Sequence, residues 1–493
     1  MKAIYIGYII FAASTLLAAG CLFVKGSYRF YKTVFTGWAL LALLTLLHYV
    51  AWRLTGSGFN ASIPYHWEFG IAGAGIADFL EIQLLAAGGF VLLAWLFLVF
   101  RKKFRNKPHS KHHYYFPAFL FAGLIPAHPL SREVYATYFN PCKTNIPAAM
   151  HFKKPVLQDS SMLLTGKKYN LVWIYAESLE RTYFNDSIFS GLVPQLKKLE
   201  AGCLSFTDVR QLEGTGWTIA GIVASQTGTP LYKLGMHANA LSKMKTFLPG
   251  AVSITDILHR NGYYIEQMQG SSAKFAGTDK YLASHHCKLT DLSDFKKLNP
   301  GLQSPHWGMY DDDLLDAVQN KYRQLQQADT PFALFISTID THHPYGRVSP
   351  RHKGRPYADG KNSILNSVYY TDSLLGAFIQ NLKRMDTENN TLIVIGSDHL
   401  AMPNEALDLL YKGKRRNMLA YYWPGHIRPG FNPKPASTLD AGVTAMDLLG
   451  FHNIKLGFGR SLISSDTTHI QRYPYHADFM IKAWERDMYF LWR

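Results

Sequence analysis

The first quarter of the chain contains four apolar stretches that carry no Asp, Glu, Lys or Arg. They cover residues 3–24, 33–52, 82–100 and 114–131. A helix needs about 20 apolar residues to cross the hydrocarbon core of a membrane, and the first three stretches are long enough. The fourth contains Pro117, Pro126 and Pro129, which make it a weaker span. We therefore expect a transmembrane module of about four helices over residues 1–131.

A cleaved signal peptide is the alternative for the first stretch, but its apolar run is too long and no Ala-x-Ala site follows. The charged loops predict the orientation. Residues 25–32 and 101–111 are basic, whereas residues 53–81 hold one basic residue and three acidic ones. Because basic loops stay in the cytoplasm, the chain beyond residue 131 is expected outside it if the fourth stretch crosses.

The net charge of +16 does not indicate a nucleic-acid partner. Residues 1–131 hold eleven Lys or Arg and three Asp or Glu, so half of the excess belongs to the membrane module. The other half is scattered, and no zinc-finger, RNP or helix-turn-helix pattern occurs. A basic surface that faces an anionic membrane is the simpler interpretation.

Cysteine is rare, with Cys21 in the first apolar stretch and Cys142, Cys203 and Cys287 beyond the membrane module. One disulfide is possible among the last three, and the sequence leaves the pair open. The chain has no Cys-x-x-Cys motif, which disfavours a thiolate zinc site.

The remaining chain alternates between strand and helix patterns. Residues 132–165 contain prolines and scattered polar residues and are expected to form a linker across the membrane surface. Continuous apolar runs then predict buried strands, and amphipathic or capped segments predict helices. The strands are expected at residues 169–176, 263–268, 332–339 and 391–396, and the helices at 194–202, 253–260 and 363–382. This order predicts a doubly wound α/β domain with a mainly parallel central sheet over residues 166–493.

Polar residues follow three of the predicted strands. Glu177, His342 and the Asp398-His399 pair each lie just beyond a strand's carboxyl end, where α/β sheets gather their ligands. Taken singly, such a Glu is equally a helix N-terminal charge, and an Asp-His pair is more often a turn. Three coincidences in one sheet favour a functional site.

The sequence of residues 211–230 predicts a turn that leads into a helix. Thr215 lies between Gly214 and Gly216, where that helix is expected to begin. A helix N-terminus suits a phosphate group, although a threonine there is by itself most often a simple cap. Two carboxylates, an imidazole and a hydroxyl form a shell for Mn²⁺, Mg²⁺ or Zn²⁺.

A divalent cation would lower the pKa of the Thr215 hydroxyl and aim its oxygen at a phosphorus atom. The sequence thus predicts a two-step displacement through a covalent phospho-threonine, with the metal held by Glu177, Asp398, His399 and Thr215. His342 or His343 would act as a general acid or as a hydrogen-bond donor to the phosphate. The alternative is that the pair only forms a turn before Pro344.

These motifs together resemble the alkaline-phosphatase-like superfamily and, within it, the phosphoglycerol transferases; the likeness to lipoteichoic acid synthases is more distant. The resemblance covers about residues 165–465. It rests on the segment Asn-Leu-Val-Trp-Ile-Tyr-Ala-Glu-Ser-Leu-Glu-Arg-Thr-Tyr at 170–183, Glu-Gly-Thr-Gly-Trp-Thr-Ile-Ala-Gly at 213–221, Asp-Thr-His-His-Pro at 340–344 and Gly-Ser-Asp-His-Leu-Ala-Met at 396–402.

The resemblance implies a multi-pass protein of the bacterial inner membrane with its catalytic domain in the periplasm. It also implies transfer of sn-glycerol 1-phosphate from phosphatidylglycerol to a hydroxyl of an envelope glycan. In such an enzyme Glu177, Asp398, His399 and Thr215 would bind one Mn²⁺-like ion, and His342 would contact the glycerol phosphate. His343, Lys274 and Trp217 are further candidates for substrate contact.

Two departures from the family pattern stand out. The aromatic-arginine pair with which lipoteichoic acid synthases bind the head group falls near Ala276 and Thr278, so the head-group residues stay open. The chain also stops at Arg493 without the long periplasmic extension of the glucan-modifying enzymes, so the acceptor could equally be a periplasmic glucan, lipopolysaccharide or capsule.

Three alternative functions share parts of this pattern. A sulfatase needs Cys or Ser in a Cys/Ser-x-Pro-x-Arg setting, and the Thr215 turn lacks it. A phosphoethanolamine transferase shares the membrane anchor and the nucleophilic threonine, and its use of a different lipid donor would distinguish it. The third alternative is a phosphodiesterase or a non-catalytic binding module of the same fold. The presence of all four types of metal-ligand residue argues against a non-catalytic module.

Overall fold

The computed structural model describes residues 2–24, 26–56, 58–60, 62–69, 76–107, 115–138, 162–231, 246–352, 354–483 and 485–492. The chain divides into two compact units. Unit 1 comprises Met1–Pro64 and Ile76–Pro141, and unit 2 comprises Tyr65–Gly75 and Cys142–Arg493. Each unit is described separately below.

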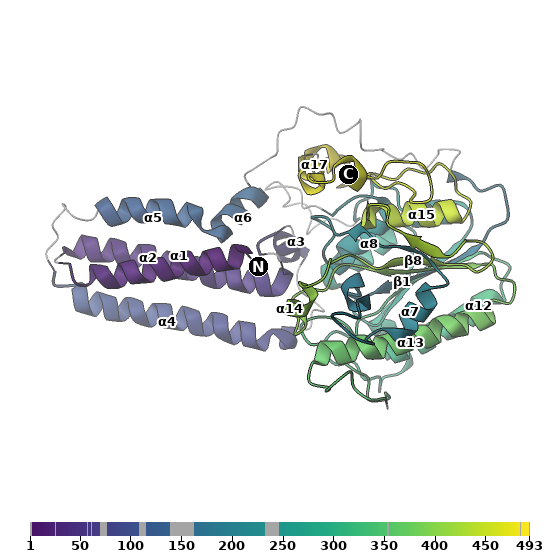
Figure 1. The fold of residues 1–493 in the computed structure, drawn as a ribbon, viewed down its shortest axis with the longest axis horizontal. Helices are drawn as coiled ribbons and strands as arrows, with labels where there is room; N and C mark the ends of the chain where they lie inside the picture. The colour runs from purple at the N-terminus through teal and green to yellow at the C-terminus, as the bar shows by residue number, and fades with distance from the viewer. Residues whose placement is uncertain are drawn as a thin grey trace. The chain divides into compact units, whose positions relative to one another are not determined.

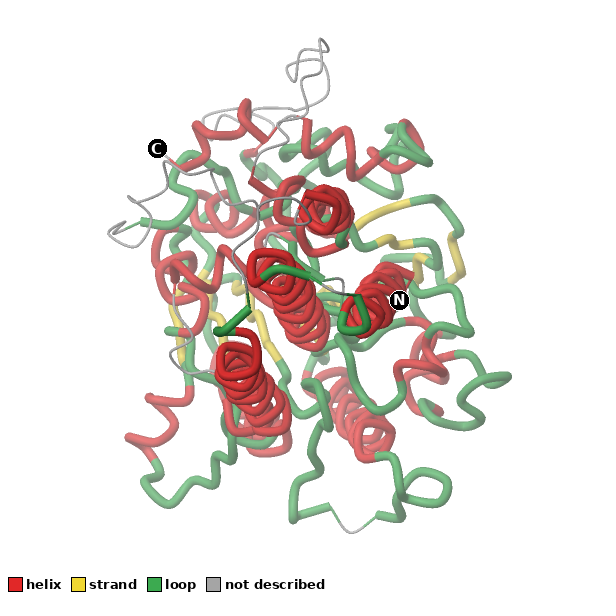
Figure 2. Tube along the Cα trace, turned by 90° about the vertical axis from the view of Figure 1, so that its left-hand side faces the viewer, coloured by secondary structure: helices red, strands yellow, loops and turns green. Residues whose placement is uncertain are grey.

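Unit 1 is built from helices that run side by side (Figure 1), and Figure 2 shows them nearly end-on. Its helices are α1 (Lys2–Cys21), α2 (Tyr28–Thr55), α4 (Leu80–Phe104), α5 (Tyr115–Ala127) and α6 (Pro129–Tyr138), with the one-turn η1 (Ile76–Phe79) before α4; α3 (Ser62–Phe69) lies across the boundary with unit 2. Helix α2 is the central element, because α1, α4, α5 and α6 all pack against it. Ser27 caps its start by accepting a hydrogen bond from the backbone N–H of Phe30.

Two of these helices, α2 and α4, are long and apolar enough to cross a membrane, and Tyr5–Cys21 and Tyr115–Ala127 are shorter apolar helices. The sequence predicted the positions of all four. The fourth predicted stretch, 114–131, divides at His128 into α5 and α6. Helix α6 also takes in the first residues of the predicted linker, and residues 139–161 of that linker lie outside the described residues.

Unit 2 contains an eight-stranded sheet in the order β5-β4-β6-β1-β7-β8-β2-β9. The strands are β1 (Asn170–Ala176), β2 (Leu204–Phe206), β4 (Tyr264–Gln269), β5 (Lys288–Thr290), β6 (Phe332–Ser337), β7 (Thr391–Ser397), β8 (Leu419–Tyr422) and β9 (Gly430–Asn432). All neighbouring pairs are parallel except the two that β8 makes with β7 and β2. The prediction of a mainly parallel sheet is therefore confirmed. A separate pair joins β3 (Val209–Arg210) to β10 (Ala436–Ser437).

Helices cover both faces of the sheet (Figure 1). On one face lie α7 (Pro194–Glu200), α12 (Asp311–Gln326) and α13 (Ser363–Met385), and on the other lie α8 (Thr218–Thr227) and α15 (Ala441–Leu448). The other helices are α9 (Ile254–Arg260), α10 (Thr278–Ser284), α11 (Leu292–Leu298), α14 (Leu407–Leu410), α16 (His469–Arg472) and α17 (Ala477–Ala483). Because both faces are covered, β1, β6 and β7 are buried at every residue.

Two cysteines of unit 2 are buried and free. Cys203 and Cys287 form no disulfide with each other or with Cys21, which is also free. Cys142, the remaining partner in the sequence hypothesis, lies outside the described residues.

Candidate active site

The two central strands β1 and β7 bring three predicted metal ligands together. Ala176 at the end of β1 pairs with Ser397 at the end of β7, so the residues that follow, Glu177 and Asp398, leave the sheet side by side. The ligand atoms of Glu177, Asp398 and His399 all lie within 4.8 Å of one another. His399 Nε2 is 3.3 Å from Asp398 Oδ2 and 3.6 Å from Glu177 Oε1.

The cluster has the hydrogen bonding expected of a cation site. All three side chains are buried, and Glu177 Oε2 and Asp398 Oδ2 have no hydrogen-bond partner among the described residues. The Nδ1 atom of His399 lies 2.9 Å from the Leu400 carbonyl and donates to it, which leaves the lone pair of Nε2 facing the carboxylates. A hydrogen bond from the ring nitrogen that does not bind the metal, here Nδ1, typically orients a metal-binding histidine.

The electrostatics agree with this interpretation. Burial, and then the charge of Asp398, raise the pKa of Glu177 well above its usual value. Two carboxylates buried together repel each other, and a divalent cation would compensate their charge. The donor set of two carboxylates and one imidazole fits Mn²⁺, Mg²⁺ or Zn²⁺.

Ser178 holds both carboxylates in place. Its backbone N–H donates to Asp398 Oδ1 at 2.9 Å, and its hydroxyl donates to Glu177 Oε1 at 2.8 Å. To do so it adopts φ of 56°, a conformation that is uncommon for a residue with a side chain. The sequence analysis did not single out Ser178, although its position directly after Glu177 was a usable signal.

Thr215 lies in the turn before α8, and not at its first residue as predicted. Helix α8 begins at Thr218, and Trp217 precedes it in an extended conformation. The Thr215 side chain is fully buried; its hydroxyl donates to the Leu212 carbonyl at 2.8 Å and accepts from the Leu212 N–H at 3.1 Å. Gly214, directly before the threonine, has φ of 77°, a left-handed conformation that glycine adopts without strain.

Helix α8 lies directly against the metal-ligand segment. A Cβ atom on Gly221, in the first turn of α8, would lie 2.0 Å from the backbone oxygen of Asp398. Only glycine permits this approach. The side chain of Gln211 makes a second link, since its Oε1 atom accepts a hydrogen bond of 2.7 Å from the N–H of Leu400. The Thr215 turn and the Asp398-His399 pair are thereby tied to each other.

His342 follows β6 and is a neutral ring in this structure. Its Nδ1 atom donates to the carbonyl of His343 at 2.7 Å, so Nε2 carries a lone pair. Burial, and to a lesser extent the nearby His399 and Arg347, lower the pKa of His342 to about 3, against the opposing effect of the His343 carbonyl. A ring with so low a pKa is a weak base, and it acts as a general acid only after it has received a proton.

The other candidates for substrate contact have different surroundings. His343 is buried, and its ring stacks on His342 with centroids 4.7 Å apart. Lys274 is exposed, and Trp217 is buried at the start of α8. Beside His342 lies a small cavity of about 40 Å³, which is lined from α8, β4, β6 and the loops after them. Its lining residues do not include His343, Lys274 or Trp217.

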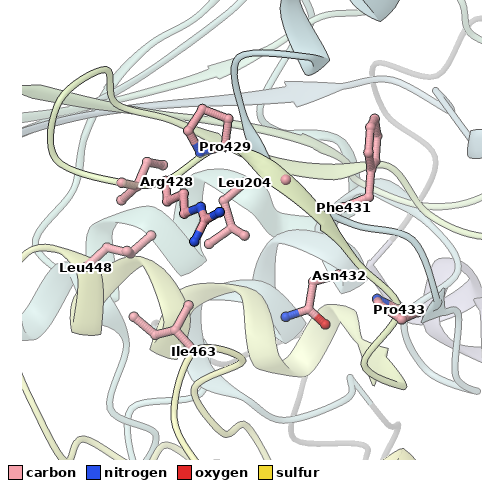
Figure 3. Close-up of a pocket in the computed structure, with 10 residues that line it drawn as sticks. Leu204, Arg428, Pro429, Phe431, Asn432, Pro433, Leu448 and Ile463 are labelled. Atoms are coloured by element: carbon pink, nitrogen blue, oxygen red, sulfur yellow. The ribbon is translucent and has the colours of Figure 1, made fainter.

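A second, more open groove of about 490 Å³ lies at the β9 edge of the sheet (Figure 3). Leu204, Arg428, Phe431, Leu448 and Ile463 are among its lining residues. None of the predicted site residues lines this groove.

The buried Glu-Asp-His cluster at the carboxyl ends of parallel strands is a candidate site for a divalent cation in an α/β domain. Residues 169–451 match the family model named Sulfatase, which covers more than half of the chain. The chain belongs to the sulfatase family. Residues 3–147 match a second model, "Phosphoglycerol transferase I, N-terminal domain". Together with the long apolar helices α2 and α4, this match identifies unit 1 as a membrane anchor.

Curated relatives named phosphoglycerol transferase I resemble most of the chain. The protein from Xanthomonas euvesicatoria pv. vesicatoria is 36% identical over 443 residues, which cover 87% of this chain and 61% of the relative. The protein from Escherichia coli O139:H28 is 33% identical over 468 residues, covering 92% and 59%. This chain thus spans about three-fifths of the length of these relatives.

Among solved structures, the lipoteichoic acid synthase LtaP from Listeria monocytogenes aligns with a TM-score of 0.48 and 18% identity, covering 58% of this chain and 73% of that chain.

Proposed function

We propose that this chain is a membrane-anchored transferase that moves sn-glycerol 1-phosphate from phosphatidylglycerol to a hydroxyl group of a cell-envelope glycan. The similarity to relatives named phosphoglycerol transferase I, in both the N-terminal segment and the catalytic unit, supports the donor and the class of reaction. The observation that carries the proposal is the buried Glu177-Asp398-His399 cluster, which the hydrogen bond from the Leu400 N–H to Gln211 ties to the turn that carries Thr215.

Glu177, Asp398 and His399 would hold one divalent cation, with Thr215 as the fourth ligand and Mn²⁺ as the preferred ion. When bound, the cation supplies positive charge that lowers the pKa of the threonine hydroxyl and offsets the charge of the phosphoryl oxygens. Glu177 Oε2 and Asp398 Oδ2 have no hydrogen-bond partner in the described parts of the chain, which supports a cation at these oxygens.

In the first step the oxygen of Thr215 attacks the phosphorus of the lipid. A bond forms between Thr215 and phosphorus, and the bond from phosphorus to the diacylglycerol oxygen breaks. The threonine hydroxyl loses its proton, and the departing diacylglycerol oxygen gains one. His342 Nε2 has a lone pair that would carry that proton from one oxygen to the other once the negative phosphate beside it offsets the effect of burial on its pKa.

In the second step a glycan hydroxyl attacks the same phosphorus, and the bond to Thr215 breaks. The proton of the glycan hydroxyl returns to the threonine oxygen, again through His342. Thr215 must leave its hydrogen bonds to Leu212 before the first attack, because both bonds engage the reacting oxygen.

The proposed topology places four spans in the bacterial inner membrane, with the basic loops in the cytoplasm and unit 2 in the periplasm. The charge of residues 25–32 and 101–111 supports this orientation. The domain assignment that follows is a membrane module over residues 1–131, a linker over 132–165 and a periplasmic catalytic domain over 166–493. Protease treatment of spheroplasts tests it: unit 2 should be cleaved from outside, and protection of unit 2 would reverse the orientation.

The activity is tested with the full chain in detergent, Mn²⁺ and labelled phosphatidylglycerol. We expect release of diacylglycerol and transfer of label to periplasmic glucan, lipopolysaccharide or capsule, whichever serves as acceptor. Thr215→Val keeps the shape of the side chain and should abolish release. Diacylglycerol released from phosphatidylethanolamine but not from phosphatidylglycerol would contradict the proposal and favour a phosphoethanolamine transferase.

A further inference from the structure

Two aromatic side chains at the start of α17 are exposed to solvent. Tyr475 is 91% exposed, and Phe479, four residues later, is 53% exposed. The other side of the helix is anchored in unit 2, because Ala477, Met480 and Ile481 are buried. Large apolar side chains that lie close together on a surface commonly mark a contact with a partner or a membrane.

Three contacts tie this segment to the turn before α8. The Glu213 N–H donates to Asp478 Oδ1 at 2.6 Å, and Lys482 Nζ lies 3.5 Å from Glu213 Oε1. The Arg210 guanidinium donates to the Pro474 carbonyl at 2.8 Å. Figure 1 accordingly shows α17 on the α8 side of the sheet.

The exposed aromatic pair, Tyr475 and Phe479, is therefore near the proposed nucleophile. Glu213 and Thr215 are two residues apart, so the chain between them spans at most about 7 Å. The head-group layer of one leaflet is about 5–7 Å thick, as judged from the full bilayer and its hydrocarbon core. A leaflet in contact with the aromatic pair thus has its lipid phosphates at about the depth of the Thr215 turn.

A basic cluster adjoins the aromatic pair. Asp208 pairs with Lys414 Nζ at 3.1 Å and with the Arg416 guanidinium. The other oxygen of this carboxylate lies 3.8 Å from Arg210 Nη2. Three cations face one carboxylate, which leaves an excess of positive charge. Because Arg210 also bonds to the Pro474 carbonyl, the basic cluster and the aromatic segment are neighbours on one surface.

The basic cluster lies at the edge of the sheet that carries the metal ligands. Lys414 and Arg416 come from the loop before β8, and the Lys414 side chain is 68% exposed. Leu419 at the start of β8 pairs with Gly396 near the end of β7, and the two strands are antiparallel. The loop before β8 is therefore beside the segment that begins with Asp398.

We propose that a docking face on unit 2 holds its active site against the anionic surface of the membrane. The docking face consists of Tyr475, Phe479, Arg210, Lys414 and Arg416. Its rings enter the head-group layer, and its cations face lipid phosphates, as in other interfacial segments. The inference rests on the proposed function, because a phospholipid donor has to reach the nucleophile from its bilayer.

The chemistry of the docking face favours a bilayer over a protein partner. The nearby acidic residues have partners within unit 2: Asp208 pairs with the three cations, Glu213 with Lys482, and Asp478 with a backbone N–H. Tyrosine is enriched at membrane–water interfaces, and basic side chains attract anionic lipids. Because unit 1 is a membrane anchor, a bilayer is also present beside every copy of unit 2.

Photo-crosslinking of the full chain in nanodiscs tests the docking face directly. Benzoylphenylalanine replaces Phe479, and the nanodiscs contain phosphatidylcholine and labelled phosphatidylserine, an anionic lipid that is not the proposed donor. We expect the α17 peptide to carry labelled lipid after illumination. Lys414→Gln should lower this label about fivefold, the effect of one cation at an anionic surface.

Lys297→Gln is the matched control for Lys414. Lys297 is 74% exposed and pairs with Asp294, but it belongs to α11, which contacts β5 at the other end of the sheet. This variant should keep the label of the wild type. A crosslink from position 479 to unit 1 or to a second copy of the chain would overturn the inference, because the face would then be a protein interface. Absence of any crosslink would overturn it as well.

Turnover separates docking from chemistry. In the double variant Tyr475→Ser and Phe479→Ser, diacylglycerol release from phosphatidylglycerol in nanodiscs should fall about tenfold. Release from a short-chain phosphatidylglycerol, with the enzyme in detergent, should stay at the wild-type rate. Phe431→Ser is the control, since Phe431 is 59% exposed on β9. Equal losses on both lipids would overturn the inference and leave the aromatic pair a support of the Thr215 turn.

Failure of the proposed function gives a different result. If phosphatidylglycerol is not turned over but position 479 crosslinks to lipid, the docking face stands and the donor is wrong. If phosphatidylglycerol is turned over and position 479 does not crosslink to lipid, the docking face alone is wrong.

Discussion

Gly221→Ala tests whether the contact between α8 and the metal-ligand segment aligns the active site. The added Cβ would lie 2.0 Å from the Asp398 backbone oxygen, and an ordinary contact begins near 3.4 Å. The two backbones must therefore separate by about 1.4 Å, because neither contacting group is a flexible side-chain end. Glycine to alanine inside a helix contributes roughly 0.5–1 kcal/mol of stability. Overpacking of a filled core costs about 1–3 kcal/mol, so the net change is destabilising.

The effect on activity should exceed the effect on stability. A misplacement of about 1 Å in a reacting group can cost about 100-fold in rate. We expect diacylglycerol release to fall by about that factor, with weaker Mn²⁺ binding, while the melting temperature drops by only a few degrees. Gly430→Ala is the control, since a Cβ there meets nothing within 4 Å. Wild-type Mn²⁺ affinity and turnover in Gly221→Ala would refute the argument.

Two further predictions concern single hydrogen-bonding groups. Ser178→Ala removes the hydroxyl that donates to Glu177 and keeps the backbone N–H that donates to Asp398. Calorimetry should therefore show an Mn²⁺ affinity about tenfold lower than that of the wild type. An unchanged affinity would contradict the role of Ser178 in positioning the carboxylates. Burial raises the pKa of Asp372 to about 6, although the backbone N–H groups of Gln195 and Leu196 donate to its carboxylate. The contribution of this group to the free energy of unfolding is therefore present below about pH 4 and is lost as the pH rises through 6. Between pH 4 and 7 the wild type should lose roughly 2–3 kcal/mol of unfolding free energy relative to Asp372→Asn, and parallel melting profiles would contradict this.

The central strands could be predicted from the sequence because both faces of β1, β6 and β7 are buried, which gives continuous apolar runs. Parallel neighbours end at the same edge, so the grouping of Glu177 with Asp398 and His399 followed from those runs. The strands at the β8-β2-β9 side were not predicted. Each has three or four residues and pairs with distant segments, so a local pattern carries little information about them.

The details of the site depended on tertiary contacts. Trp217 adopts an extended conformation, which moves the start of α8 to Thr218 and leaves Thr215 in a turn; no propensity in the sequence specifies this. Trp307 lies in a loop, and its place over His342 depends on the hydrogen bonds of Arg347 to that loop's carbonyls. Helix α12 starts with three aspartates and was not predicted either, although acidic residues commonly occupy a first helical turn.

The central claim is that Thr215 becomes covalently attached to the transferred group, and one measurement tests it directly. The full chain in detergent is incubated with Mn²⁺ and phosphatidylglycerol without acceptor, quenched in acid and digested for mass spectrometry. We predict that the peptide containing Thr215 carries a glycerophosphoryl group and that Glu177→Gln, which replaces a proposed metal ligand, lacks it. Diacylglycerol release with an unmodified Thr215 peptide, or the adduct on another residue, would contradict the account.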